Sequence, residues 1–413
     1  MRTALALLLL AVSAQTAHAQ TGTSAPPAGP AAVTAASGRC GVCHPAERVQ
    51  FEKSRHAPES VRCVSCHGGD DRSLEAAVAH GAGFRGRPAR RDIPKLCASC
   101  HADEAQMRPY SLSVDQYALY QISGHGRRLA RGDDQVAVCS DCHGAHEVLA
   151  TRDPASSTYA LNIPRTCGRC HGNTALMRTR GRADVLRAYQ SSVHAHALTG
   201  KGNLRAPTCV SCHGAHGAAP PALGSADKVC GQCHTAERRY YSAGVHAAGN
   251  PGRAGDRRPE CVSCHEAHGV QAARPERLGT SCVMCHEGDS PRLDLGRRIW
   301  NGYRTATGVA DKAAALVAKA DAIPIPTEDY HARIEEALTY LREALPAAHS
   351  VRPEIVAGFT TRARAVGQEV QQEIRGKLGN LRQHKYVLLA FWFYVLLTLF
   401  VLKRFRDQAA RNR

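Results

Sequence analysis

Cys209-Val210-Ser211-Cys212-His213-Gly214-Ala215-His216 is the stretch around which this chain is organised. Its first five residues follow the pattern Cys-x-x-Cys-His, which occurs nine times between Gly38 and Glu287. The nine copies begin at Cys40, Cys63, Cys97, Cys139, Cys167, Cys209, Cys230, Cys261 and Cys282. All 18 cysteines lie in these copies, so the sequence leaves none for a disulfide or a free thiol.

Cys-x-x-Cys-His is the attachment sequence of a c-type haem, with two thiols for the vinyl groups and a histidine for the iron. Structural zinc sites also use Cys-x-x-Cys pairs, but they do not require a histidine directly afterwards. Here the histidine follows all nine times, so we predict nine covalently attached haems c. The predicted attachment cysteines are Cys40, Cys43, Cys63, Cys66, Cys97, Cys100, Cys139, Cys142, Cys167, Cys170, Cys209, Cys212, Cys230, Cys233, Cys261, Cys264, Cys282 and Cys285. The predicted iron ligands within the motifs are His44, His67, His101, His143, His171, His213, His234, His265 and His286.

The composition agrees with a chain packed around cofactors. Aromatic residues make up only 5% of the 413 residues, so large side chains for a core are scarce. The formal charge of +17 could indicate a nucleic acid or an anionic membrane as partner. Haem propionates offer a simpler counter-charge for scattered Arg and Lys side chains, and we predict no nucleic-acid partner. The predicted fold is mainly α with much irregular loop, followed by long helices.

A larger repeat contains two motifs and two further histidines. Repeat 3 shows it best: the motif at Cys167, a short helical stretch ending at His194, and the motif at Cys209 with trailing His216. The predicted second ligands are His56 and His80 in repeat 1, His125 and His146 in repeat 2, His194 and His216 in repeat 3, and His246 and His268 in repeat 4. His80 is an irregular member, because Gly68-Gly69-Asp70 follows Cys66-His67 where a trailing histidine is expected.

The trailing histidine lies too close in sequence to its own motif to reach the other face of the same iron, so it should ligate a neighbouring haem. His196 is an alternative to His194. The motif at Cys282 stands alone after the four repeats, and its second ligand is left open. Candidates for this ninth position are His196, His331, His349, His384, Met107 and Met177, or an open iron face; Met284 lies inside its own motif and is set aside.

The two ends of the chain indicate export and a membrane anchor. Residues 1–19 resemble a secretory signal peptide, with Arg2, an apolar run and Ala17-His18-Ala19 before the cleavage site; an uncleaved anchor is the alternative. Residues 20–37 form a predicted disordered lead-in, and 38–290 the nine-haem domain. Residues 291–385 have helical periodicity, including Tyr330, Ile334 and Leu341 on one face.

Residues 386–402 contain no charged side chain, which predicts a transmembrane helix, although a buried core helix fits the same pattern. Residues 403–413 form a basic tail, which the positive-inside rule places in the cytoplasm. The predicted location is therefore the cytoplasmic (inner) membrane, with a single C-terminal span and the haem domain in the periplasm.

The motifs with trailing Gly-Ala-His or Glu-Ala-His resemble the superfamily of octahaem cytochromes, hydroxylamine oxidoreductase and pentahaem nitrite reductase, over about residues 38–380. The resemblance implies electron transfer or the reduction of a small nitrogen or sulfur compound. No Cys-x-x-Cys-Lys occurs, which departs from pentahaem nitrite reductases. The chain is also similar in plan to membrane-anchored quinol dehydrogenases, whose anchor is usually N-terminal, so direct quinol oxidation is in doubt.

Two functions follow from these patterns. The first is electron transfer between the quinone pool, or a quinone-linked membrane subunit such as a cytochrome b, and periplasmic carriers or terminal reductases of anaerobic respiration. The same electron-transfer function could be performed by the chain as a subunit of a larger respiratory complex. The alternative is an enzyme that converts a small nitrogen or sulfur compound at one open haem. No catalytic residue is predicted.

Overall fold

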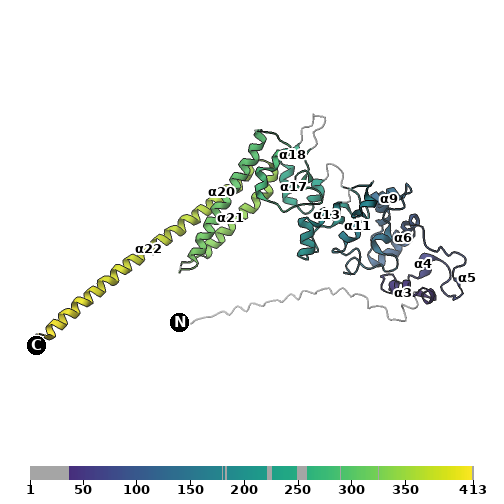
Figure 1. The fold of residues 1–413 in the computed structure, drawn as a ribbon, viewed down its shortest axis with the longest axis horizontal. Helices are drawn as coiled ribbons and strands as arrows, with labels where there is room; N and C mark the ends of the chain where they lie inside the picture. The colour runs from purple at the N-terminus through teal and green to yellow at the C-terminus, as the bar shows by residue number, and fades with distance from the viewer. Residues whose placement is uncertain are drawn as a thin grey trace, which may run out of the picture. The chain divides into compact units, whose positions relative to one another are not determined.

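The structure is a computed structural model that describes residues 37–178, 180–181, 184–220, 226–248, 258–288, 290–323 and 325–411. The predicted signal peptide and nearly all of the predicted lead-in lie outside these residues. The described residues form helices and loops without a strand, with short helices around the motifs and three long helices at the C-terminal end (Figure 1). The predicted fold class is confirmed.

The chain divides into two compact units. Unit 1 comprises Met1–Tyr117 and Arg128–Tyr159, and unit 2 comprises Ala118–Arg127 and Ala160–Arg413. The helices of unit 1 are α2 (Cys40–Cys43), α3 (Pro45–Glu52), η1 (Ala57–Glu59), α4 (Cys63–His67), α5 (Ala76–Ala79), η2 (Arg90–Asp92), α6 (Ile93–His101), α7 (Glu104–Met107), η3 (Arg108–Tyr110) and α10 (Cys139–His143). Two of the three boundaries between the units fall within α8 (Gln116–Ile122) and α9 (Gly124–Leu129), and the third lies between Tyr159 and Ala160.

Unit 2 contains short helices followed by the three long ones. The short helices are α11 (Ile163–His171), α12 (Thr174–Met177), α13 (Val185–Gln190), α14 (Val193–Ala195), η4 (His196–Gly200), α15 (Cys209–His213), α16 (Ala226–Cys230), α17 (Thr235–Ser242), α18 (Val245–Ala248), α19 (Cys261–His265), η5 (Pro275–Gly279) and η6 (Ser281–Met284). The long helices are α20 (Pro291–Ala320), α21 (Glu328–Ala347) and α22 (Pro353–Arg411), with η7 (Ala348–Ser350) between the last two.

The second motif of each repeat has its own local fold. Helices α4, α10, α15 and α19 each begin at the first cysteine and end at the motif histidine. The backbone N–H before the first cysteine donates to the side chain of the residue before the second cysteine, as from Thr208 to Ser211 Oγ at 3.0 Å. The residue after the histidine then adopts a positive φ, 78° at Gly214. Capping at the start and a left-handed residue at the end restrict each helix to the motif itself.

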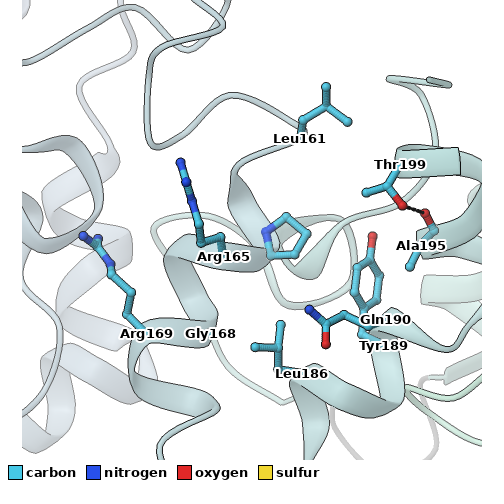
Figure 2. Close-up of a pocket in the computed structure, with 10 residues that line it drawn as sticks. Leu161, Arg165, Gly168, Arg169, Leu186, Tyr189, Gln190, Ala195 and Thr199 are labelled. Carbon is cyan, nitrogen blue, oxygen red and sulfur yellow. Dashed lines mark hydrogen bonds between the residues drawn. The ribbon is translucent and has the colours of Figure 1, made fainter.

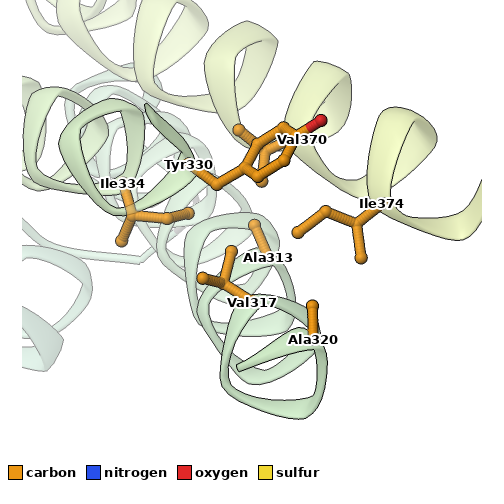
Figure 3. Packing of buried hydrophobic residues seen from close by; sticks show 7 residues of the cluster. All are labelled: Ala313, Val317, Ala320, Tyr330, Ile334, Val370 and Ile374. Atoms are coloured by element: carbon orange, nitrogen blue, oxygen red, sulfur yellow. The ribbon is translucent and has the colours of Figure 1, made fainter. Parts of the chain in front are cut away.

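Helices α20, α21 and α22 form a three-helix bundle. Helices α20 and α22 run in the same direction, and α21 runs antiparallel to both. At one end Ile299 of α20, Ala347 of α21 and Val356 of α22 share a buried cluster. At the other end the cluster is Ala313, Val317, Ala320, Tyr330, Ile334, Val370 and Ile374 (Figure 3). The middle cluster contains Ala306, Ala310, Ala337, Leu341 and Ala363. Because alanine predominates, the helix axes can approach closely.

Ile374 is fully buried in the end cluster of this bundle, so its truncation should be costly. We expect Ile374→Ala to lower the free energy of unfolding by about 2–4 kcal/mol, since it removes buried methyl groups and leaves a cavity. Urea unfolding of the detergent-solubilised protein, followed by far-UV circular dichroism, measures this change. The control Gln368→Ala, at an exposed position of the same helix, should stay within about 0.5 kcal/mol of the parent.

Helix α22 leaves the bundle and continues to Arg411 without interruption, although Gly376, Gly379 and Asn380 lie within it. It contains an 18-residue window with a mean hydropathy of 2.1, and none of that window is buried in the structure. Among the described residues it is the one helix that is long and apolar enough to cross a membrane. The chain could therefore be anchored through its C-terminal helix.

Candidate haem sites

Eight motif histidines each face a histidine from outside the motifs. Their ring centroids lie 6.0 to 6.5 Å apart. The pairs, with the motif histidine first, are His44–His80, His101–His56, His67–His146, His171–His125, His234–His194, His213–His268, His286–His246 and His265–His349. Each of these pairs joins a motif histidine to a non-motif histidine. General aromatic contact would not select that combination.

The spacing fits two imidazoles on opposite faces of one metal. With a metal–nitrogen bond of about 2 Å on each side, and about 1 Å from each nitrogen to its ring centre, the centroids lie about 6 Å apart. A tetrahedral zinc site would instead gather four side chains. Within the described ranges, no group of three or more His, Cys, Asp or Glu side chains is arranged to hold a metal ion. The paired rings leave room for a flat macrocycle between them.

In three of the paired histidines, a hydrogen bond from Nδ1 to a backbone carbonyl leaves Nε2 available to ligate a metal. Nδ1 of His67 donates to the carbonyl oxygen of Gly86 at 2.8 Å, and Nδ1 of His213 to that of Ala219 at 3.0 Å. His349 makes the same kind of bond to Pro346 at 3.1 Å. A protonated Nδ1 that is held by a carbonyl leaves Nε2 as the free lone pair, which is how metal-ligating histidines are usually oriented.

Burial favours the neutral form of three of the paired rings. It is the main cause that lowers the pKa of His56, His194 and His265, and the charge of the facing ring in each pair lowers it further. A histidine must be unprotonated at the coordinating nitrogen to bind a metal. The environment of these rings therefore favours the form that can ligate iron.

The pairing connects successive repeats. His56 of repeat 1 faces the motif histidine His101 of repeat 2, and His268 of repeat 4 faces His213 of repeat 3. His44–His80 is the one described pair inside a single repeat. The isolated last motif is served from repeat 4, because His286 faces His246. The position that needs a ligand from outside the repeats is therefore His265, not His286.

The other predicted ligands and the candidates for the ninth position are distributed over both units and the bundle. Of the predicted ligands, His143 belongs to unit 1 and His216 to unit 2. His331 pairs with Asp321 at 3.0 Å on the bundle surface, and His384 lies in the exposed part of α22. His196 packs against Gly200, where a Cβ would lie 2.8 Å from its Nδ1. Met107 and Met177 are buried, and Met284 is exposed.

A buried serine positions three of the second histidines. Ser54, Ser123 and Ser192 each lie two residues before the histidine and are 3% exposed or less. Ser192 Oγ accepts a hydrogen bond from the Ala195 backbone at 3.1 Å, and Ser123 Oγ accepts one from Gly126 at 2.9 Å. These N-caps stabilise helices of a single turn, which have little stability of their own.

A tyrosine ties the second-histidine helix to the following motif. Tyr189 donates from its hydroxyl to the carbonyl oxygen of Pro207 at 2.8 Å, and Tyr241 donates to that of Pro259 at the same distance. Both tyrosines lie five residues before the second histidine, and both carbonyls lie two residues before a motif cysteine. The sequence analysis did not identify these serines and tyrosines as positioning residues. Their constant offsets from His194 and His246 were the available signal.

Consecutive motifs are neighbours in space within each unit. The sulfur atoms of the first cysteines interact in the pairs Cys40–Cys63, Cys97–Cys139, Cys167–Cys209 and Cys230–Cys261. The second cysteines interact in the pairs Cys66–Cys100, Cys212–Cys233 and Cys264–Cys285. Along the sequence, a motif thus neighbours one adjacent motif through its first cysteine and the other adjacent motif through its second cysteine. Groups attached at these sulfurs would be arranged in the order of the motifs.

A cavity of about 600 Å³ lies beside the motif at Cys167. Leu161, Leu186 and Tyr189 contribute apolar surface to it, while Arg165 and Arg169 contribute guanidinium groups (Figure 2). Gly168, between the two cysteines, also lines it and faces Leu186, whose Cδ2 would be 2.5 Å from an added Cβ. Apolar walls with cations nearby suit an apolar macrocycle that carries carboxylates, so the residues present fit a haem.

Comparison with known families agrees with this chemistry. Residues 132–235 match the family model of cytochrome c3, and this segment contains the motifs at Cys139, Cys167, Cys209 and Cys230. No curated protein and no solved structure matches the chain. The family match supports a multihaem c-type cytochrome that carries covalently bound haem and transfers electrons.

Proposed function

We propose that this protein is a nine-haem electron-transfer protein of the cytoplasmic membrane, with its haem domain in the periplasm and α22 as its anchor. The observation that carries the proposal is the set of eight facing histidine pairs. Bound haem iron supplies a one-electron redox centre, and two histidine ligands favour electron transfer over substrate binding. The predicted cysteines would hold the macrocycles, and the eight pairs of motif and second histidines would close both faces of eight irons.

The alternative, an enzyme acting on a small nitrogen or sulfur compound, requires an iron with one face open to the substrate. At eight motif histidines a second imidazole faces the position where such a substrate would bind. Within each unit, the neighbouring sulfurs of consecutive motifs also support stepwise transfer between the groups attached there. The resemblance to octahaem cytochromes and hydroxylamine oxidoreductase remains a prediction.

The bundle separates the last motifs from the predicted membrane segment. Cys282 lies against the start of α20, since a Cβ on Gly296 would be 2.9 Å from its sulfur. The start of α20 packs against the start of α22, where Ile299 contacts Val356. From Pro353 to Tyr386 is 33 residues along one helix, or about 50 Å at 1.5 Å per residue. These motifs are therefore far from a quinone in the membrane.

This separation supports a partner as the electron donor or acceptor on the membrane side. We propose a quinone-linked subunit, such as a cytochrome b, acting through a redox group that extends beyond the membrane surface. Periplasmic carriers or reductases would exchange electrons at the other end. Direct exchange between this chain and quinol is not expected.

The proposal is tested on the full-length protein in detergent. Haem quantification should give nine haems per chain, and electron paramagnetic resonance of the oxidised protein should show low-spin iron. In proteoliposomes, quinol alone should leave the haems oxidised, and a quinol-oxidising partner subunit should allow their reduction. A high-spin signal that nitrite, hydroxylamine or sulfite perturbs would favour the enzyme. Rapid reduction by quinol alone would contradict the need for a partner.

A further inference from the structure

The turn between α21 and α22 is tightly held and contains a histidine that the repeats do not account for. Ser350 is fully buried; its Oγ donates to the carbonyl oxygen of Ala347 at 2.7 Å and accepts from the N–H of Arg352 at 3.2 Å. Val351 adopts a left-handed conformation with φ of 52°. These constraints fix the backbone on both sides of His349, so its ring is presented in one direction.

That direction is toward the motif histidine His265. The two ring centroids lie 6.0 Å apart, with 28° between the ring planes. This matches the other seven described pairs in distance. The Nδ1 bond to Pro346 leaves Nε2 of His349 free for a metal, as for His67 and His213. The geometry is therefore that of a second axial ligand.

The turn also repeats a local sequence found after three motifs. Trailing histidines occur in Ala145-His146-Glu147-Val148, Ala215-His216-Gly217-Ala218 and Ala267-His268-Gly269-Val270, and the turn has Ala348-His349-Ser350-Val351. In the first three, the carbonyl two residues after the histidine accepts a hydrogen bond from the backbone N–H of the residue that precedes a second histidine. The bonds are Arg55 to Val148 at 2.8 Å, Gly124 to Ala218 at 2.8 Å and Val193 to Val270 at 2.9 Å.

The fourth second-histidine helix, α18, meets the turn at the corresponding place. Gly244 stands two residues before His246, where the other repeats have the buried serines Ser54, Ser123 and Ser192. A Cβ on Gly244 would lie 2.8 Å from Ser350 Cα and 3.0 Å from the carbonyl oxygen of His349. A side chain would not fit there. Because residue 244 is a glycine, the turn can approach the backbone there closely.

We infer that the turn at residues 348–351 is a displaced copy of the trailing-histidine segment, and that His349 is the second axial ligand of the iron held by His265. A helical domain thereby supplies a ligand to the haem array. The coordination bond fastens the end of the bundle, four residues before α22 begins, to the motif at Cys261 and Cys264. This inference rests on the proposed function, because it requires haem at that motif.

The first test compares His349→Ala with wild type in the haem-loaded, detergent-solubilised protein. We expect a high-spin ferric signal amounting to one iron per chain, and binding of one carbon monoxide by the reduced protein. Added imidazole should return the signal to low-spin, which a merely structural role would not predict. The control is His331→Ala in the preceding helix α21, whose ring faces Asp321; it should retain the wild-type spectrum.

Two further variants test the inference independently. His349→Met keeps a ligand at the same place and should raise the reduction potential of one haem, because methionine in place of histidine favours the reduced iron. Gly244→Ser installs the serine of the other repeats, which would push the turn away and produce the same high-spin signal as His349→Ala. Its control, Gly308→Ser on α20, has no atom within 4 Å of the added Cβ and should have no effect.

The outcomes separate this inference from the proposed function. A wild-type protein without covalent haem, or with several high-spin irons, would contradict the proposed function whatever His349 does. A low-spin wild type with an unchanged spectrum in His349→Ala would overturn the ligand assignment alone. If all irons stay low-spin in Gly244→Ser, the close packing of the turn against residue 244 does not hold His349 in place, and the inference that the turn is a displaced trailing-histidine segment is wrong.

Discussion

Ending the chain at Leu378 is expected to move the protein almost completely from the membrane to the soluble periplasmic fraction. The truncation removes residues 379–413, including the predicted span at 386–402. It retains Ile374 and Leu378, which pack in the end cluster of the bundle. Inserting 17 uncharged, largely apolar residues into a bilayer is favourable by several kcal/mol, on the order expected from per-residue insertion energies. Their removal should therefore abolish anchoring and leave the bundle folded.

Fractionation followed by haem staining measures the change. A second truncation ending at Leu402 removes only the basic tail, so it should remain in the membrane pellet. The soluble form should keep its nine haems and the low-spin signal of the full-length protein, because the motifs and the eight histidine pairs all precede residue 379. If the shorter protein stays in the pellet after a high-salt wash, α22 is not the anchor that holds it.

His194→Ala should convert one iron from low-spin to high-spin, whereas His196→Ala should leave all irons low-spin. The His194 ring faces the motif histidine His234 at 6.3 Å, while His196 packs against Gly200. Removing His194 leaves one face of that iron without a protein ligand, so a small ligand can bind there.

Electron paramagnetic resonance and carbon monoxide titration of the two variants provide the measurement. The expected stoichiometry is one open iron per chain for His194→Ala and none for His196→Ala. The two variants remove the same type of side chain two residues apart, His194 from α14 and His196 from η4. The reverse result would identify His196 as the ligand and would contradict the observed pairing.

The motif chemistry is local, and for that reason the sequence was informative about it. Both cysteines and the first histidine lie within five consecutive residues, so no folding information is needed to connect them. The helical periodicity after residue 290 also predicted the bundle: Tyr330, Ile334 and Leu341 are buried as expected.

The partner of each motif histidine is not local. His56 and His101 are 45 residues apart in sequence, and His265 and His349 are 84 apart. The ring centroids of each pair nevertheless lie 6.0 Å apart. The sequence left His349 among several candidates for the last motif, at His286. The structure instead brings His246 to His286 and His349 to His265. The Ala-His-x-Val pattern at 348–351 was a usable signal, but its position inside a helical hairpin concealed it.

By itself, the sequence predicted which residues would attach haem and identified the apolar segment at 386–402, since both properties belong to short contiguous stretches. Only the tertiary structure decided which two histidines face each other. The second ligand can come from any part of the chain that the fold brings to the far side of the first. That choice depends on packing between repeats, and at residue 349 on the absence of a side chain at Gly244.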